Sequence, residues 1–121
     1  MTKEINICIV HFNTPYLTEC LVKSINKCVP NSVIYIFDNS DKFPFTYRQN
    51  NIIYFDNTKG QIINFDNWLD SIKTKVSTVN NWASAKHCYT IEKCMELIPD
   101  GFILLDSDTL LKKDITELYY H

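Results

Sequence analysis

The sequence predicts an α/β fold with a mainly parallel sheet. Three observations indicate this class: short apolar segments typical of strands alternate with longer segments of helical periodicity, polar residues follow the strands, and prolines and glycines fall between the elements. With 121 residues, 45% of them hydrophobic, the chain is long enough to form one domain with its own core. We therefore expect a single domain over residues 1–121.

The first elements are a strand and a helix. Residues 5–11 consist mainly of Ile, Val and Cys and predict a strand. Pro15 fits the first turn of a helix, for which Thr14 is the expected cap. Pro30 ends this helix. Its apolar residues recur at helical spacing: Leu17, Leu21, Ile25 and Cys28.

The rest of the chain continues the alternation. Three more strands are expected, at 33–37, 52–55 and 102–105, and three more helices, at 62–75, 82–97 and 114–120. The last strand carries four successive apolar residues, a pattern typical of burial on both faces. The buried face of the helix at 82–97 is expected to contain Ala85, Cys88, Ile91, Met95 and Ile98. Asn81 is its expected cap, after a polar linker at 74–80.

Polar clusters follow the first, second and fourth predicted strands. They are residues 11–13, residues 38–40 and residues 106–108, which read His-Phe-Asn, Asp-Asn-Ser and Asp-Ser-Asp. The carboxyl ends of parallel strands meet at one edge of the sheet, and ligands bind at that edge in open α/β sheets. The sequence therefore predicts one site there. Two carboxylates one residue apart, Asp106 and Asp108, can hold a divalent cation, and the cation can hold a diphosphate.

Five segments carry short phrases in a recognisable order: 9–17, 20–25, 36–40, 83–87 and 106–111. Together they resemble the N-terminal half of a GT-A glycosyltransferase, closest to the inverting family 2 enzymes of bacterial surface polysaccharide synthesis. The resemblance covers nearly the whole chain. It implies a three-layer, nucleotide-diphospho-sugar-transferase-like domain with strand order 3-2-1-4. The sequence departs from the family where a glycine is absent after Asn39 and where His87 replaces an asparagine.

The resemblance also implies a donor site with a metal. The residues implied to bind the nucleotide sugar are His11, Phe12, Asn13, Asp38, Asn39, Lys86 and Asp106; those implied to hold Mn²⁺ or Mg²⁺ are Asp106 and Asp108. Asp38 would accept a hydrogen bond from the base, with the N3–H of uracil as the expected donor. Lys86 would face the nucleotide or diphosphate as a point charge.

The implied reaction transfers a sugar, most simply from a UDP-sugar, to a saccharide or lipid-linked acceptor, with inversion. The family's acceptor-binding half and general base lie after the D-x-D, whereas only residues 109–121 follow Asp108. We therefore expect a cut or truncated chain that binds donor and turns over poorly, and no catalytic residue is assigned. Two alternatives remain open. One is a non-catalytic nucleotide-binding or interaction module, and the other a haloacid-dehalogenase-type phosphatase, whose Gly-Thr is absent after Asp108.

Charge and composition exclude other classes. The net charge of −2, without a basic block, argues against a nucleic-acid partner. No apolar run approaches the roughly 20 residues of a membrane span, and the start of the chain does not resemble a signal peptide. We expect a cytoplasmic protein, with room for peripheral membrane association of the full-length protein. The five cysteines lack any C-x-x-C pair and are expected to be free thiols.

Overall fold

The computed structural model describes residues 4–72 and 82–119. In this part of the chain, four strands form one sheet in the order β3-β2-β1-β4, and every neighbouring pair is parallel. The strands are β1 (Ile5–His11), β2 (Ser32–Asp38), β3 (Ile52–Asp56) and β4 (Ile103–Leu105). The helices are α1 (Pro15–Cys28), α2 (Phe65–Ile72), α3 (Trp82–Leu97) and α4 (Thr116–Tyr119). The α/β class, the parallel sheet and the strand order expected from the sequence are confirmed.

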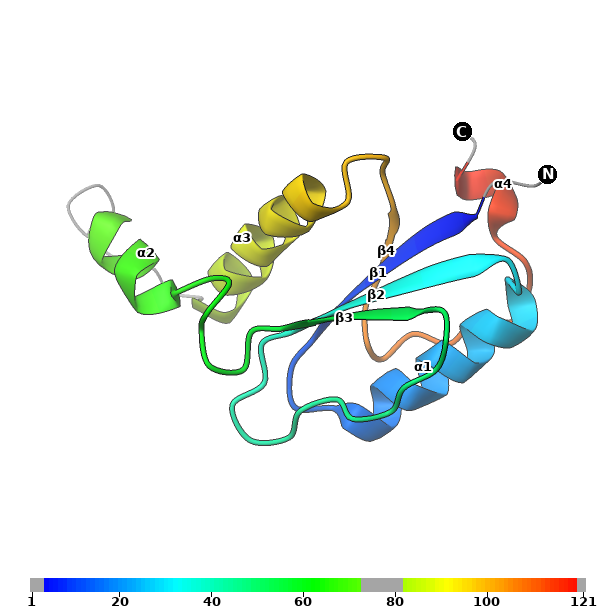
Figure 1. Cartoon of the computed structure of the whole chain (residues 1–121), viewed down its shortest axis with the longest axis horizontal. Helices are drawn as coiled ribbons and strands as arrows, with labels where there is room; N and C mark the ends of the chain where they lie inside the picture. The colour runs from blue at the N-terminus through cyan, green and yellow to red at the C-terminus, as the bar shows by residue number, and fades with distance from the viewer. Residues whose placement is uncertain (1–3, 73–81, 120–121) are drawn as a thin grey trace.

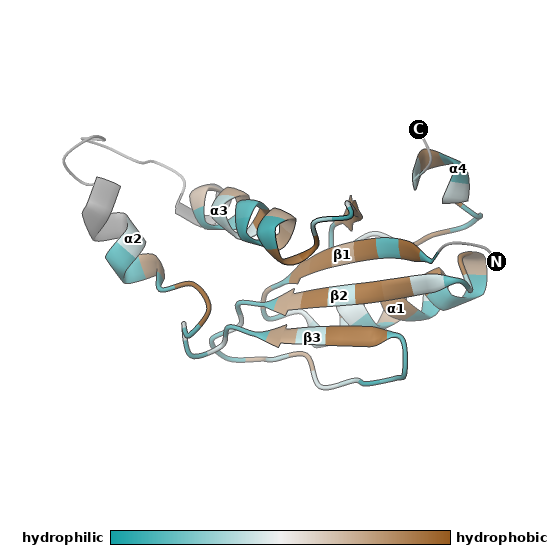
Figure 2. Ribbon diagram, turned by 45° about the horizontal axis from the view of Figure 1, so that its top comes forward, coloured by the Kyte–Doolittle hydropathy of each residue, from teal (hydrophilic) through white to brown (hydrophobic). Residues whose placement is uncertain are grey.

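The elements form three layers. Helix α1 covers one face of the sheet, and α3 covers the other (Figure 1). The strands are hydrophobic over most of their length, and hydrophilic loops follow β2 and β3 on the side of the molecule where α2 lies (Figure 2). The carboxyl edge of the sheet is therefore polar and faces the entry into α2.

Two apolar cores lie on the two faces of the sheet. The register aligns Ile9 with Ile36 and with Leu105. Because side chains alternate along a strand, each strand contributes to both cores. The core towards α1 contains Ile7, Ile9, Ile34 and Ile36, together with Leu21, Val22 and Ile25 of the helix. The core towards α3 contains Cys8, Phe37, Cys94 and Ile98. This alternation decides which strand-end residues share a face.

Helix α1 begins at Pro15, as expected, but Thr14 does not cap it with its side chain. The Thr14 hydroxyl instead donates to Ser107 Oγ at 3.3 Å, which links the helix start to the segment after β4. The buried face also differs from expectation: Thr18 and Val22 are buried beside Leu21 and Ile25, in place of Leu17 and Cys28. Thr18 is fully buried whereas Leu17 is 43% exposed, because Thr18 Oγ1 is hydrogen-bonded to His11 Nδ1 at 2.6 Å.

Helix α3 has the expected bounds, but of the five residues expected on its buried face only Ile98 is buried. Cys88 and Met95 are exposed, while Thr90, Cys94 and Ile98 are buried. The buried residues recur every four positions, on a different stripe from the most apolar one. Apolar periodicity missed this stripe because Thr90 is a polar residue whose hydroxyl is hydrogen-bonded in the interior.

Helix α2 begins later than expected, at Phe65 rather than at residue 62. Asn57 Oδ1 accepts hydrogen bonds from the amides of Ile62 and Ile63, which holds them in a loop. Gly60 lies in the turn with φ 66°, a left-handed conformation that favours glycine. The expected linker at 74–80 and the cap Asn81 lie outside the described residues.

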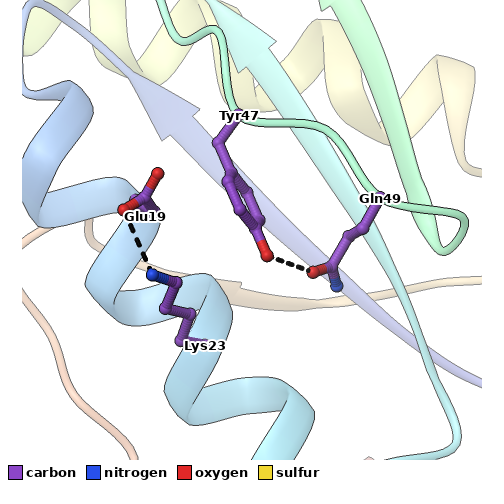
Figure 3. Close-up of polar contacts among 4 residues, drawn as sticks. All are labelled: Glu19, Lys23, Tyr47 and Gln49. Atoms are coloured by element: carbon purple, nitrogen blue, oxygen red, sulfur yellow. Dashed lines mark hydrogen bonds and ion pairs between the residues drawn. The ribbon is translucent and has the colours of Figure 1, made fainter.

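The loop between β2 and β3 packs over α1 (Figure 3). Tyr47 donates its hydroxyl hydrogen bond to Gln49 Oε1 at 2.9 Å, and Lys23 Nζ lies 5.6 Å from the Tyr47 ring centroid. Lys23 also forms an ion pair with Glu19, one turn earlier in the helix, at 3.3 Å. Phe45 and Tyr47 of this loop also pack on the apolar core towards α1, so the loop covers the α1 side of the sheet.

Strand β4 is shorter and more exposed than expected. Ile103, Leu104 and Leu105 are all only partly buried, because β4 lies at the edge of the described sheet. The expectation of burial on both faces was therefore wrong. Among the described residues, no helix combines the length and apolarity needed to cross a membrane.

Candidate functional site

A pocket of about 440 Å³ opens at the carboxyl edge of β1 and β2, on the α3 side of the sheet. Its lining combines apolar, aromatic, acidic and basic side chains: Val10, Phe12, Asn39, Asp41, Phe65, Lys86 and His87. This is the edge at which open α/β sheets bind ligands. A mainly apolar lining with a few polar groups is typical of small-molecule sites.

The aromatic wall of the pocket is formed by Phe12 and Phe65. Phe12 follows β1 and is 56% exposed, so its ring is available to a ligand. Phe65 is the first residue of α2, and Lys86 Nζ of α3 lies 5.3 Å from the centroid of its ring. Trp68 stacks on Tyr89 with centroids 4.9 Å apart, which joins α2 to α3. The two helices thus hold the aromatic and cationic sides of the pocket together.

Asn13 shapes the loops at the pocket rather than reaching into it. It adopts φ 55°, a left-handed conformation that asparagine tolerates. Its Nδ2 donates to Asp41 Oδ1 at 2.6 Å, and its Oδ1 accepts from the amides of Lys42 and Phe43 at 3.0 Å. The hydrogen bond from Asn13 holds the pKa of Asp41 below its ordinary value. Asp41 therefore presents a carboxylate at the pocket.

Asp38 does not face the pocket. It is fully buried, and its carboxylate accepts three hydrogen bonds, from Ser40 N at 2.9 Å, Phe45 N at 2.8 Å and Tyr54 Oη at 2.7 Å. The geometry does not support the expectation that this carboxylate contacts the base of a nucleotide. We assign it to holding the loop that follows β2.

His11 is likewise fully buried, against the expectation that it lines the pocket. Its ring lies between Thr18 Oγ1, at 2.6 Å from Nδ1, and Phe43 O, at 3.4 Å from Nε2. Burial lowers the pKa of His11, although the charge of Asp38 acts in the opposite direction. His11 therefore lies within the α1 side of the fold, and its side chain does not line the pocket.

The alternation of side chains explains both corrections. His11 and Asp38 are aligned in the sheet and continue the series that points towards α1. Phe12 and Asn39, one position later, fall on the α3 side together with Val10. The pocket therefore contains Phe12, Asn39 and Lys86 of the expected set, and excludes the side chains of His11 and Asp38.

Asn39 lines the pocket, and both the oxygen and the nitrogen of its side-chain amide are hydrogen-bonded. Its Oδ1 accepts from Asn57 Nδ2 at 2.8 Å, and its Nδ2 donates to Thr90 Oγ1 at 3.0 Å. Its backbone N–H donates to His11 O at 2.9 Å. Asn39 thus ties the ends of β1, β2 and β3 to α3.

Asp106 and Asp108 lie beyond β4, at the same edge of the sheet, and both are exposed. Leu105 is aligned with Ile9, so Asp106 follows at the level of Val10, one strand spacing or about 4.8 Å away. Extending the alternation from Leu104 places Asp106 on the α3 side. Neither carboxylate accepts a hydrogen bond or ion pair from a described residue.

The pair Asp106 and Asp108 fits a hard divalent cation in part. Carboxylate oxygens are the ligands that Mg²⁺ and Mn²⁺ prefer, and Mg²⁺ commonly takes one or two carboxylates and completes its shell with water and substrate phosphates. Within residues 4–72 and 82–119, no three His, Cys, Asp or Glu side chains gather in a metal-binding arrangement. A cation here would therefore depend on an anionic ligand for further oxygens.

Four pocket residues were not expected from the sequence: Val10, Asp41, Phe65 and His87. Val10 and Asp41 lie within two residues of expected site residues, and strict alternation identifies Val10. No sequence pattern marked Phe65 as a pocket residue, because it lay inside the expected helix at 62–75.

Comparisons of the chain with protein-family models, with curated proteins and with solved structures find no match.

Proposed function

We propose that this chain is the donor-binding portion of a GT-A type glycosyltransferase and that its pocket takes a nucleotide-diphosphate sugar. One observation carries the proposal. An aromatic wall and a lysine line the pocket at the carboxyl edge, and an exposed D-x-D follows β4, the strand next to β1, at the same edge. A base, a diphosphate and a cation need these three kinds of group.

The aromatic side of the pocket suits the base. Phe12 and Phe65 offer ring faces on which a nucleobase can stack. Asp41 replaces Asp38 as the proposed acceptor for the N3–H of uracil, because it is exposed and lines the pocket. One of its oxygens already accepts a hydrogen bond from Asn13, and an ionised carboxylate has further acceptor capacity.

The cationic side suits the diphosphate. Lys86 is exposed on α3, and its ammonium can approach phosphate oxygens as a point charge. Asp106 and Asp108 would hold Mn²⁺ or Mg²⁺. That cation supplies neutralisation of the negative charge that develops on the nucleoside-diphosphate leaving group. The proposed acceptor is a saccharide or a lipid-linked saccharide, and its binding groups are not assigned to this chain.

Isothermal titration calorimetry tests the proposal. UDP, GDP and inorganic phosphate are titrated into the protein with and without Mn²⁺. We expect UDP binding that requires Mn²⁺, a loss of at least tenfold in affinity in Asp108→Ala, and a similar loss in Lys86→Met. Asp100→Ala is the matched carboxylate control, because Asp100 is exposed in the turn before β4, at the opposite edge of the sheet.

Lys93→Met is the matched control for Lys86→Met. Lys93 lies on the same helix but away from the pocket, in an ion pair with Glu96 at 3.2 Å. Both control variants are expected to bind UDP within twofold of the unaltered protein. Absence of UDP binding, or binding unaffected by Mn²⁺ and by Asp108→Ala, would overturn the proposal. Hydrolysis of a simple phosphate ester would instead favour the dehalogenase-type phosphatase.

A further inference from the structure

A chain of hydrogen bonds runs from the end of β3 to the turn of α3 that carries Lys86. Asn57 Nδ2 donates to Asn39 Oδ1 at 2.8 Å, Asn39 Nδ2 donates to Thr90 Oγ1 at 3.0 Å, and the Thr90 hydroxyl donates to Lys86 O at 2.8 Å. Each of the three donors has one acceptor, so the hydrogen bonds all run in the same donor-to-acceptor direction, from Asn57 to Lys86 O. We call Asn57, Asn39 and Thr90 the amide relay.

The amide relay is buried at both ends. Asn57 is 3% exposed and Thr90 is fully buried, so each polar group depends on its protein partners. Leaving such a group unsatisfied carries a desolvation penalty. Asn57 also donates its backbone N–H to Asp38 O at 2.9 Å, which fixes the relay to the sheet.

Asn57 also accepts a second set of hydrogen bonds, from the segment that leads to the other side of the pocket. Its Oδ1 accepts from the amides of Ile62 and Ile63 at 2.9 and 2.8 Å, two residues before Phe65 begins α2. The residues that these two sets position meet where Lys86 Nζ lies over the Phe65 ring. Phe65 of the aromatic wall and the Lys86 cation are therefore both positioned from one buried amide.

The hydroxyl of Thr90 has no packing role that valine could not fill. Threonine and valine have the same branched shape, and both are poorer helix formers than the straight-chain residues. What distinguishes Thr90 is that its oxygen accepts from Asn39 and donates to Lys86 O. The hydroxyl therefore serves to fix this turn of α3 against the edge of the sheet.

We propose that the amide relay positions Lys86 over the pocket and so sets the affinity for the diphosphate. This inference rests on the proposed function. Thr90 does not line the pocket, so it is a positioning residue and not a ligand contact. Loss of its hydroxyl lets the turn that carries Lys86 shift away from the place at which the lysine meets the phosphates.

The test compares Thr90→Val with Thr90→Ser by calorimetry with UDP and Mn²⁺. We expect Thr90→Val to weaken UDP binding five- to tenfold and Thr90→Ser to stay within twofold of the unaltered protein, because serine retains the hydroxyl. Thr18→Val is the matched control. Thr18 is also fully buried in a helix and hydrogen-bonded, to His11, but lies on the opposite face of the sheet.

A double-mutant cycle separates positioning of Lys86 from general loosening. In the unaltered protein Lys86→Met is expected to cost about tenfold in UDP affinity, whereas in the Thr90→Val background it should cost less than threefold. A shift in thermal stability alone would leave the two losses multiplicative. We also expect Thr18→Val to lower the melting temperature while UDP affinity stays within twofold.

Each outcome decides between the two proposals. UDP binding by the unaltered protein together with an unchanged Thr90→Val, or with fully multiplicative losses in the cycle, overturns the relay and leaves the proposed function standing. Failure of the unaltered protein to bind UDP overturns the proposed function and, with it, the ligand role of the relay. Failure of Thr90→Ser to restore affinity shows that the hydroxyl is not the active group and also overturns the relay.

Discussion

Replacing Tyr54 by phenylalanine tests whether Asp38 is a structural anchor. The Tyr54 hydroxyl donates to Asp38 Oδ2 at 2.7 Å, and burial followed by this hydrogen bond raises the pKa of Tyr54. A hydrogen bond to a charged group contributes about 1.5–3 kcal/mol. Because Tyr54 is only half-buried, we expect Tyr54→Phe to lower the free energy of unfolding by about 1.5 kcal/mol, at the low end of that range.

Changes to Asp38 itself should cost more. Asp38→Ala removes the acceptor of the Ser40 and Phe45 amides, and both residues are about 1% exposed. Each unsatisfied buried donor costs about 1–3 kcal/mol, so we expect a loss of about 3–5 kcal/mol. This is a large part of the roughly 5–15 kcal/mol that stabilises a typical domain, so Asp38→Asn, which retains one oxygen, provides a milder variant.

Urea unfolding followed by circular dichroism measures these losses. Tyr47→Phe is the matched control, since it removes the same hydroxyl from the loop that precedes β3, but its partner is the neutral Gln49 Oε1. We expect the control to lose less than about 1 kcal/mol. A cycle of Tyr54→Phe with Asp38→Asn should show coupling, because the tyrosine loses its charged partner.

The opposite pattern would refute the assignment. If Asp38 were a ligand carboxylate, Asp38→Asn would leave the free energy of unfolding within about 0.5 kcal/mol of the unaltered protein, as for a surface substitution. It would then abolish UDP binding without any coupling to Tyr54. Equal losses in Tyr54→Phe and Tyr47→Phe would also contradict a charged anchor at position 38.

Two further predictions concern buried titratable groups. Burial lowers the pKa of His11. Its contribution to stability is therefore complete above the unfolded-state pKa of about 6.5 and is lost as the pH falls below that value. Urea unfolding between pH 5 and 7.5 should show this loss of stability; a free energy of unfolding that does not change with pH, or one that changes equally in His11→Gln, would contradict it. Among the thiols, a hydrogen bond with Cys94 and then burial raise the pKa of Cys8. Thiol-disulfide reagents with mass mapping should therefore modify exposed Cys88 first, and Cys8 and Cys94 only on unfolding; modification of Cys8 in the folded protein would contradict this.

The sequence predicted the sheet well for a physical reason. Strands β1 and β2 lie in the interior of the described sheet, so apolar residues run without interruption from Ile7 to Val10 and from Val33 to Phe37, and polar residues mark the carboxyl ends of both strands. Helix α3 could be bounded because Pro99 and Gly101 follow it. Its orientation could not be predicted, since burial of Thr90 depends on hydrogen bonds to Asn39 and Lys86 O, and apolar periodicity carries no information on these.

The sequence predicted at which edge of the sheet the pocket lies, but it predicted only some of the side chains that line the pocket. The strand-end argument brought Phe12, Asn39 and Lys86 together in one pocket. It did not anticipate the burial of Asp38, because the presence of a carboxylate at a strand end does not show whether backbone amides already occupy it. The three donors to Asp38 include Phe45 N and Tyr54 Oη, from a loop and from β3, and only the folded chain brings them near.

The alternation of side chains offers a rule that would have separated, from the sequence, the strand-end residues that point towards α1 from those that point towards the pocket. In a parallel sheet, aligned residues of neighbouring strands share a face, so once one strand-end residue is placed the others follow. His11 is aligned with Asp38, and Leu105 with Ile9 and Ile36. All of these point towards α1, which assigns the next residue of each strand to the pocket side: Phe12, Asn39 and Asp106. The rule places Asp106 on the pocket side of the sheet, so that of the two carboxylates of the D-x-D it assigns Asp106 to the face that carries the pocket.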